Sequence, residues 1–400
     1  MSGTIIIGAG QAGSSAAFKL RALGYDADIT LIGDEPHPPY QRPPLSKAYL
    51  LGEMARERLF LRPTPAYGEN GITLLTGTTV STIDPVAKTV TTHNGVLSFD
   101  DLVLTTGATP RKLPGTVGGD LDGVYTVRTL ADIDAMAAEF RKGACALIIG
   151  GGYIGLEAAA VAAKRGVTTT LVERDARILG RVAAEETADY FRDLHRAHGV
   201  DIREGVDLAR LVGNTQVTGA EFADGSRLDV DFVLVGIGIL PDTGLAGAAS
   251  LTLNNGIACD AMGRTSDPNI WAAGDCASFP HGSGRIRLES VGNAIDMAEA
   301  VAANITGADT PYVPKPWFWS DQYDVKLQIA GLNSGYDRVV VRDGGAARSH
   351  WYYAGDTLLA IDAMNDPRAY MVGKRLIEAG KSAEPAAVAN PDTDLKALLK

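Results

Sequence analysis

Apolar runs alternate with glycine-rich turns in two stretches of this sequence. Residues 4–35 follow the order of a strand, a glycine turn, a helix and a second strand, and residues 146–175 repeat that order. Residues 316–400 differ, because the runs YDRVVVRD, ARSHWYYAG and TLLAIDAMN are strand-like and are separated by glycine-containing turns. The pattern predicts an α/β protein with two nucleotide-binding folds, followed by a short antiparallel sheet with helices.

Both strand–turn–helix stretches carry the glycine pattern G-x-G-x-x-G. The first glycine allows a sharp turn, the second lets a pyrophosphate approach the backbone, and the third lets helix and strand pack closely. The helix that follows presents free N–H groups and a partial positive charge to the phosphates. One copy would be weak evidence, but two copies in the same frame indicate two dinucleotide sites. The glycines are Gly8, Gly10 and Gly13 in the first stretch and Gly150, Gly152 and Gly155 in the second.

An acidic residue follows or ends the second strand of each stretch. Asp34 and Glu35 lie there in the first stretch and Glu173 in the second, where a carboxylate accepts hydrogen bonds from ribose hydroxyls. Glu173 favours NADH, because its charge repels the 2′-phosphate of NADPH, although Arg174 follows directly. Arg181 is expected near the pyrophosphate or the adenine. Two such sites predict a flavin and a nicotinamide as the cofactors.

Composition narrows the class of protein. A chain of 400 residues with 46% hydrophobic and 21% charged residues is typical of a globular protein with two or three domains. A net charge of −11 argues against nonspecific nucleic-acid binding. The sequence has no apolar run long enough for a membrane span, and its start lacks the basic region of a secretory signal. We therefore expect a cytoplasmic enzyme without nucleic-acid or membrane partners.

The three cysteines do not form a recognisable functional pair. Cys145, Cys259 and Cys276 show no CxxC spacing, which argues against a zinc site or a dithiol redox motif. We expect buried or half-buried thiols in a reduced compartment, and no metal site.

Further motifs resemble the two-dinucleotide-binding flavoprotein family. LVLTTGATPRKLP (102–114), VLVGIGILPD (233–242) and NIWAAGDCAS (269–278) are similar to its linker strand, its return strand and its second FAD motif. Disulfide reductases of this family carry two cysteines after the first nucleotide strand pair, and the peroxidase-like and coenzyme A disulfide members keep one. The corresponding stretch here, HPPYQRPPLSKAYL (37–50), has none, which excludes the thiol branch because no nucleophilic sulfur is available.

Within that family the chain resembles the NADH:ferredoxin reductases of bacterial oxygenase systems, of the putidaredoxin reductase type. PPYQRPPLSK, GGGYIGLE and PWFWSDQYD carry this likeness. It implies electron transfer from NADH through FAD to a 2Fe–2S ferredoxin, by a monomer or homodimer. Relatives that serve dioxygenases often have tryptophan at the position of Val291, so valine favours a haem-thiolate monooxygenase as the final acceptor. An NADH oxidase, a monodehydroascorbate-type small-molecule reductase and a non-catalytic redox-sensing flavoprotein are the alternatives.

The resemblance also implies a glutathione-reductase-like arrangement of domains. Residues 1–112 and 240–315 would form the FAD domain, residues 113–239 the NADH domain, and residues 316–400 a C-terminal α+β domain.

The resemblance implies a set of FAD contacts. Ala12 would meet the pyrophosphate through its backbone, Asp34 the adenosine ribose and Val80 the adenine. Arg42 would neutralise phosphate charge, and Asp275 would hold the ribityl chain. The full set is Gly8, Gly10, Ala12, Gly13, Asp34, Arg42, Lys47, Val80, Arg128, Asp275 and Val291.

Ordinary structural roles remain open for several of these residues. The alternative for Asp275 is a helix N-cap after a buried strand, and that for Arg42 is a surface arginine in a proline-stiffened loop. Arg128 would be a helix-start charge, since Thr129 and Asp132 give the following segment a capping-box-like start.

On the nicotinamide side, the resemblance places Ile154 against the pyrophosphate, and Gly238 would leave room for the nicotinamide end. The full set is Gly150, Gly152, Ile154, Gly155, Glu173, Arg181 and Gly238.

Lys47, Glu157 and Trp319 are the candidate catalytic residues. In the resembled family the matching lysine and glutamate meet near flavin N5, where a cation stabilises negative charge on the reduced ring. Each buried charge needs the other, because either one alone costs several kcal/mol. The simpler alternative for Glu157 is a carboxylate favoured by the dipole at a helix N-terminus.

Residues 316–324, PWFWSDQYD, hold two of the four tryptophans. Strand alternation places Trp317 and Trp319 on one face and Phe318 on the other. The resemblance puts Trp319 close to the flavin and Trp317 nearer the surface, where a ferredoxin would dock. The alternative is that both indoles belong to the core of a small α/β domain.

Overall fold

The computed structural model describes residues 3–399, which form two compact units. The first unit contains the chain up to Gln41, Arg56–Thr109 and Leu240–Pro316. The second contains Arg42–Ala55, Pro110–Ile239 and the chain from Trp317 onward. The chain passes from one unit to the other within strand β8 (Ala108–Pro110) and again within strand β17 (Ile239–Pro241).

The first unit is built on a five-stranded parallel sheet with the order β19-β7-β1-β2-β3. Its strands read as almost continuous apolar runs, because helices and loops cover both faces of a parallel sheet. All four residues of β1 are buried, and α1 packs against α7. The bounds are β1 Thr4–Ile7, β2 Ile29–Ile32, β3 Ile72–Leu75, β7 Asp101–Leu104, β19 Ile270–Ala272, α1 Gln11–Ala22 and α7 Val291–Ile305.

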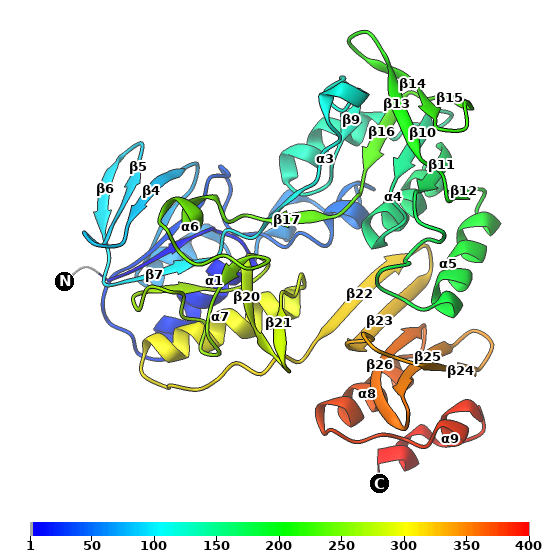
Figure 1. Ribbon diagram of the computed structural model, residues 1–400. Helices are drawn as coiled ribbons and strands as arrows, with labels where there is room; N and C mark the ends of the chain where they lie inside the picture. The colour runs from blue at the N-terminus through cyan, green and yellow to red at the C-terminus, as the bar shows by residue number, and fades with distance from the viewer. Residues whose placement is uncertain (1–2, 400) are drawn as a thin grey trace. The chain divides into compact units, whose positions relative to one another are not determined.

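Smaller elements complete the first unit (Figure 1). An antiparallel sheet joins β4 (Val80–Asp84), β5 (Thr89–Thr92) and β6 (Gly95–Ser98). A second small sheet has the order β18-β20-β21, with bounds Ile257–Ala258, Ala277–His281 and Gly284–Ile286. The remaining helices are η2 (Arg56–Leu59), α2 (Thr64–Glu69) and α6 (Gly244–Ala248).

The second unit contains another five-stranded parallel sheet, with the order β12-β11-β10-β16-β9. An antiparallel sheet, β13-β14-β15, accompanies it. The strands are β9 Val124–Tyr125, β10 Cys145–Ile149, β11 Thr168–Glu173, β12 Asp201–Glu204, β13 Leu208–Gly213, β14 Val217–Phe222, β15 Arg227–Asp229 and β16 Phe232–Val235. The helices are η1 Leu45–Tyr49, η3 Gly115–Val117, α3 Leu130–Met136, η4 Ala137–Glu139, α4 Tyr153–Lys164 and α5 Glu185–Ala197.

The C-terminal part of the second unit is an antiparallel sheet with the order β22-β23-β26-β25-β24. Helix α8 packs on its inner strands, and α4 packs against the edge strand β22. The bounds are β22 Trp317–Gln322, β23 Val325–Gly331, β24 Arg338–Asp343, β25 Arg348–Ala354, β26 Thr357–Met364, α8 Pro367–Glu378, α9 Pro385–Ala389 and η5 Leu395–Leu399.

The predicted fold class, two Rossmann-like sheets and a C-terminal α+β part, is confirmed. Residues 42–55 lie in the second unit, where η1 contacts α3 and α4. The division of the second unit into an NADH domain (113–239) and a C-terminal domain (316–400) stays a prediction. Two short helices, α9 and η5, lie near the C-terminus.

Two further observations concern the described residues 3–399. No helix among them combines the length and the hydrophobicity that a bilayer crossing requires. No cluster of histidine, cysteine, aspartate or glutamate in this part of the chain is arranged to hold a metal ion.

Candidate functional site

The turn that carries the first G-x-G-x-x-G pattern, here called the first fingerprint turn, shows which glycines are required by close backbone packing and which leaves space for a ligand. Gly8 has a φ of 110°, and a Cβ on it would collide with the carbonyl oxygen of Thr105. A Cβ on Gly13 would collide with the carbonyl oxygen of Gly8. Gly10 instead has no atom within 4 Å of an added Cβ, and it is the N-cap of α1 without any side-chain cap. The N-terminus of α1 is therefore open and positively polarised, as a pyrophosphate requires.

The second fingerprint turn repeats this geometry at the start of α4. Gly150 has a φ of 108°, and added Cβ atoms on Gly150 and Gly155 would strike backbone carbonyl oxygens. Gly152 has open space around an added Cβ and caps α4 with no side-chain hydrogen bond. Ile154 follows, and its side chain is exposed beside that space. Both turns thus fit a dinucleotide pyrophosphate.

The other predicted FAD residues of the first unit lie at strand ends, in a turn and in the first turns of helices. Ala12 is buried in α1, and a Cβ on Gly274 would come within 3.0 Å of the Ala12 Cβ. The turn that carries Asp275 therefore lies against the first fingerprint helix. The alternative role of Asp275, as a helix N-cap, is excluded because β20 follows that turn. The remaining placements are an exposed Asp34 after β2, a buried Val80 at the start of β4, and a half-buried Val291 at the start of α7.

Arg42 and Arg128 come together in the second unit. The Arg42 Nη1 donates a hydrogen bond of 2.6 Å to the carbonyl oxygen of Arg128. Arg128 precedes the capping box of α3, in which the Asp132 backbone N–H donates to Thr129 Oγ1 at 3.1 Å. The carboxylate of Asp132 accepts the backbone N–H of Thr129 at 2.8 Å in return, so the predicted capping box is confirmed.

The second unit also brings Lys47 and Glu157 together. Lys47 Nζ lies 3.0 Å from Glu157 Oε1, and only 15% and 4% of the two side chains are exposed. Ser46 Oγ donates to Glu157 Oε2 at 2.8 Å, and Ser320 Oγ donates to Oε1 at 2.7 Å. Lys47 has a second carboxylate partner, Asp321 Oδ2, at 3.3 Å. Each oxygen of the buried carboxylate therefore has a hydrogen-bond donor.

Burial sets the electrostatics of this pair. Loss of hydration raises the pKa of Glu157, and the Lys47 ammonium and the two serine hydroxyls oppose that rise. Ionisation of the buried Glu157 carboxyl group therefore costs free energy, and it depends on Lys47 and the two serines to offset that cost.

The tryptophans of β22 form a half-buried wall next to this pair. The rings of Trp317 and Trp319 stack with their centroids 5.5 Å apart, which fits their predicted position on one strand face. Lys47 Nζ lies 5.7 Å from the Trp319 ring centroid. Phe318, on the other face, packs against Tyr153 of α4 at 5.0 Å. Neither indole is fully buried, so these two residues are not core in the way that Trp351 is.

Glu173 ends β11 as predicted, and its carboxylate closes over the second fingerprint turn. It accepts the backbone N–H of Gly151 at 2.7 Å and that of Asp175 at 2.9 Å. Gly238 has a φ of 96°, and an added Cβ there would lie 3.7 Å from Arg181 Nη2. The predicted nicotinamide residues therefore lie around the carboxyl ends of β10, β11 and β16.

The cysteines are unsuited to thiol chemistry. All three are free, Cys259 and Cys276 are buried, and Cys145 is half-buried, as expected. Burial raises the pKa of both buried thiols, that of Cys259 to about 12. A thiolate is thus disfavoured at both positions.

Three side chains that contact the ion pair were not expected from the sequence: Ser46, Ser320 and Asp321. A local signal was available for Ser320. Strand alternation places it with Phe318 on the face of β22 opposite the two tryptophans, and that face packs against α4. No comparable signal exists for Ser46, which meets Glu157 from a distant part of the chain.

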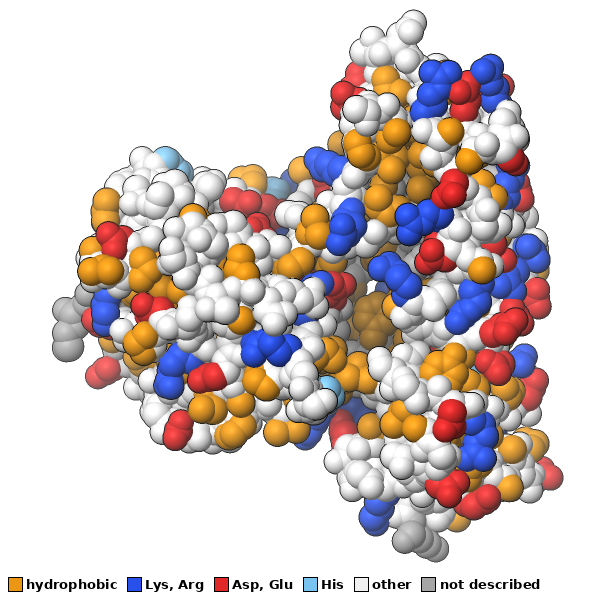
Figure 2. Space-filling model, viewed as in Figure 1, with side chains coloured by type: hydrophobic (Ala, Val, Ile, Leu, Met, Phe, Trp, Pro, Cys, Tyr) orange, Lys and Arg blue, Asp and Glu red, His pale blue; other side chains and the backbone are white. Residues whose placement is uncertain are grey.

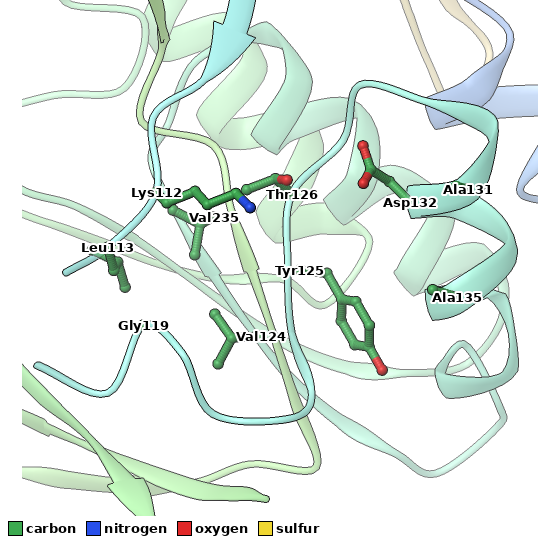
Figure 3. Close-up of a pocket in the computed structure, with 10 residues that line it drawn as sticks. All are labelled: Lys112, Leu113, Gly119, Val124, Tyr125, Thr126, Ala131, Asp132, Ala135 and Val235. Carbon is green, nitrogen blue, oxygen red and sulfur yellow. The ribbon is translucent and has the colours of Figure 1, made fainter. Parts of the chain in front are cut away.

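The second unit also has a pocket of about 240 Å³ that contains none of the predicted cofactor residues. Figure 3 shows that β9, α3 and the chain around Lys112 and Gly119 surround it. Its polar side chains are Lys112, Tyr125, Thr126 and Asp132.

Known proteins resemble this chain along its whole length. Residues 3–298 match the pyridine nucleotide-disulphide oxidoreductase family, and residues 317–399 match the reductase C-terminal family. The chain is 43% identical to a ferredoxin–NAD(P)(+) reductase from Sphingomonas sp., over 98% of this chain and 96% of that protein. It is 40% identical to putidaredoxin reductase from Pseudomonas putida, over 99% and 96% of the two chains.

A solved structure agrees with these sequence matches. The covalent putidaredoxin reductase–putidaredoxin complex superposes with a TM-score of 0.95 at 40% identity, over 100% of this chain and 98% of that one. The chain therefore belongs to the pyridine nucleotide-disulphide oxidoreductase family, among its FAD-dependent ferredoxin reductases.

Proposed function

We propose that this chain passes electrons from NADH, through bound FAD, to a 2Fe–2S ferredoxin that supplies a haem-thiolate monooxygenase. The observation that carries the proposal is the buried Lys47–Glu157 pair beside Trp319, in a stretch of chain without cysteine. FAD, when bound, accepts a hydride and releases electrons one at a time, which joins a two-electron donor to a one-electron acceptor.

The residues of the chain bind and orient the two nucleotides. The open N-termini of α1 and α4 receive the pyrophosphates, with Gly10 and Gly152 at the points of approach. Asp34 and Glu173 accept ribose hydroxyls, and the charge of Glu173 favours NADH over NADPH. Glu173 is already aligned, because the backbone N–H of Gly151 holds one of its oxygens.

Lys47 supplies a positive charge at a fixed position on a side chain that is only 15% exposed. Lys47 keeps its ammonium between Glu157 and Asp321, so this charge needs no reorganisation when negative charge develops next to it. Trp319 covers Lys47 with a flat apolar ring and excludes water from that side.

The thiols give the electrons no alternative route through the protein. A disulfide reductase passes electrons to a cysteine pair, but residues 37–50 contain no cysteine, and the buried thiols elsewhere have raised pKa values. This supports an external electron acceptor.

Trp317 marks the surface on which we expect the ferredoxin to dock. Lys374 of α8 lies 5.9 Å from the Trp317 ring and 3.4 Å from Glu378. Aromatic and basic side chains together suit a small acidic protein, and a brief redox encounter needs little buried area. Figure 2 shows acidic and basic side chains interspersed over the second unit on the face it presents, which favours a local contact over a large uniform field.

Steady-state assays with NADH test the proposal. The purified FAD-loaded enzyme is given oxygen, ferricyanide or a 2Fe–2S ferredoxin from a monooxygenase system as the acceptor. We expect the ferredoxin to accelerate NADH consumption far beyond the rate with oxygen alone. An NADH oxidase would show its full rate with oxygen, and a redox-sensing flavoprotein would consume NADH slowly with every acceptor.

A further inference from the structure

A chain of hydrogen bonds inside the second unit connects Glu157 to Tyr323, which packs against His195 and His198 at the C-terminal end of α5. Ser320 Oγ lies 2.7 Å from Glu157 Oε1, and Gln322 Nε2 lies 3.1 Å from Ser320 Oγ. His195 Nε2 is 2.8 Å from Gln322 Oε1, and the Tyr323 hydroxyl is 3.0 Å from His195 Nδ1. The chain therefore uses the polar residues of PWFWSDQYD on the strand face opposite the tryptophans.

The charge on Glu157 fixes the direction of every bond in this chain. An ionised carboxylate only accepts, so Ser320 must give it the hydroxyl proton. The Ser320 oxygen then accepts from the amide nitrogen of Gln322, which leaves the amide oxygen facing His195. His195 must donate to that oxygen from Nε2 and accept the Tyr323 proton at Nδ1. All four bonds therefore point toward Glu157.

Burial makes this order costly to break. As whole residues, Ser320, Gln322 and His195 are 0% exposed and Glu157 is 3% exposed. A reversed or missing bond would leave a buried polar group without a partner. Aligned hydrogen bonds also polarise one another, so the remote members strengthen the Ser320–Glu157 bond.

The neighbours of the chain keep its members in the required protonation states. Burial lowers the pKa of His195 to about 4, which the hydrogen bond to Gln322 opposes and the nearby His198 supports, so His195 stays neutral near pH 7. Burial also raises the pKa of Tyr323, which keeps its hydroxyl as a donor. Lys47 faces Glu157 directly, and Asp321 faces Lys47.

We propose that Gln322 and His195 are positioning residues, which hold Glu157 ionised against Lys47 through a one-way series of hydrogen bonds that begins at Tyr323. The proposal explains how the charge of Glu157 in the ion pair is maintained. Its link to electron transfer rests on the proposed function. The consequence is that Lys47 keeps a buried carboxylate partner, because a protonated Glu157 would leave its ammonium paired only with the half-exposed Asp321.

Nitrogen NMR of histidine-labelled, FAD-loaded enzyme tests the direction of the chain. The protein has six histidines, and the His195 signals are assigned by their loss in His195→Gln. We expect a neutral ring with its proton on Nε2 across the neutral pH range. A proton on Nδ1 alone would reverse both bonds of His195, and a doubly protonated ring at pH 7 would prevent Nδ1 from accepting the Tyr323 proton; either result would overturn the proposal.

Isotope-edited infrared spectroscopy of glutamate-labelled enzyme tests the effect on Glu157. The signal of its protonated carboxyl group is assigned with Glu157→Gln and followed against pH in Ser320→Ala, Ser320→Thr and Gln322→Met. We expect the Glu157 pKa to rise by about one unit or more in Ser320→Ala. The rise should be smaller in Gln322→Met, and Ser320→Thr should stay close to wild type because it keeps the hydroxyl.

His350→Gln is the matched control. His350 is another fully buried histidine of the same unit, and it bonds to Thr187 at 2.7 Å, outside this chain. We expect both histidine variants to lower the stability of the protein. Only His195→Gln should raise the Glu157 pKa, and His350→Gln should leave it unchanged. Equal pKa shifts in both histidine variants, or none in Ser320→Ala, would contradict the proposal. Both spectroscopic results are independent of the acceptor, so a failure to reduce ferredoxin would refute the proposed function alone.

Discussion

Removal of the Lys47 charge should expose the energetic cost of the buried carboxylate. At 3.0 Å the Lys47–Glu157 attraction is about 5.5 kcal/mol for an effective dielectric constant near 20. In Lys47→Met the carboxyl group escapes part of this loss by taking up a proton, which costs about 3.7 kcal/mol at pH 7 from an unperturbed pKa. We therefore expect Lys47→Met to lower the free energy of unfolding by about 3–4 kcal/mol at pH 7.

The pH dependence of this loss has a definite sign. In Lys47→Met the folded-state pKa of Glu157 lies above its unfolded value, so the folded chain binds more protons than the unfolded chain between those two values. Its stability relative to wild type should therefore fall as the pH rises through that window. The deficit should be smallest near pH 4, where both states of the variant carry a protonated carboxyl group.

The assay is guanidinium unfolding at a fixed excess of FAD, followed by tryptophan fluorescence, because Trp319 lies next to Lys47. The double variant Lys47→Met/Glu157→Gln removes both charges and should recover about 2 kcal/mol relative to Lys47→Met. The control is Lys19→Met, which breaks the solvent-exposed Lys19–Glu299 pair and should cost under about 1 kcal/mol. Equal losses in the single and double variants, without any pH dependence, would refute this reasoning.

Three further predictions concern the nucleotide sites and the thiols. Gly10→Ala should fold normally but lose FAD on gel filtration, and FAD retention equal to that of wild type would contradict the assignment. Gly13→Ala should instead lower the free energy of unfolding by about 3 kcal/mol, because the added methyl group overlaps the backbone. Glu173→Ser should reduce the ratio of kcat/KM for NADH over NADPH by about tenfold or more, and an unchanged ratio would remove Glu173 from cofactor selection. A thiol reagent should modify at most the half-buried Cys145 of the native enzyme without loss of ferredoxin reduction, so inactivation that tracks modification of a buried cysteine would argue for thiol chemistry.

Local sequence patterns were sufficient wherever a contact is made within one strand–turn–helix unit. The roles of Gly8 and Gly13 follow from a turn of a few residues, and the Thr129–Asp132 capping box spans a single helical turn. The stacking of Trp317 on Trp319 follows from alternation within one strand. Such contacts depend on backbone geometry that the motif itself imposes.

Contacts between distant segments could not be derived in the same way. Ser46 and Ser320 meet Glu157 across separations of 111 and 163 residues, and no local pattern encodes that meeting. The resemblance, rather than the spacing, paired Lys47 with Glu157. Asp275 shows that a local pattern can also be ambiguous. An aspartate after a buried strand is compatible with a helix N-cap as well as with a ligand contact, and only the strand β20 that follows it excludes the cap.

An anaerobic titration tests the central claim most directly. The FAD-loaded enzyme is first bleached with one equivalent of NADH, and an oxidised 2Fe–2S ferredoxin is then added while the flavin and iron–sulfur absorbances are followed. The account predicts that the yellow flavin colour returns as two ferredoxin molecules are reduced for each NADH consumed. A reduced flavin that keeps its electrons in the presence of excess ferredoxin, yet yields them to oxygen, would contradict it.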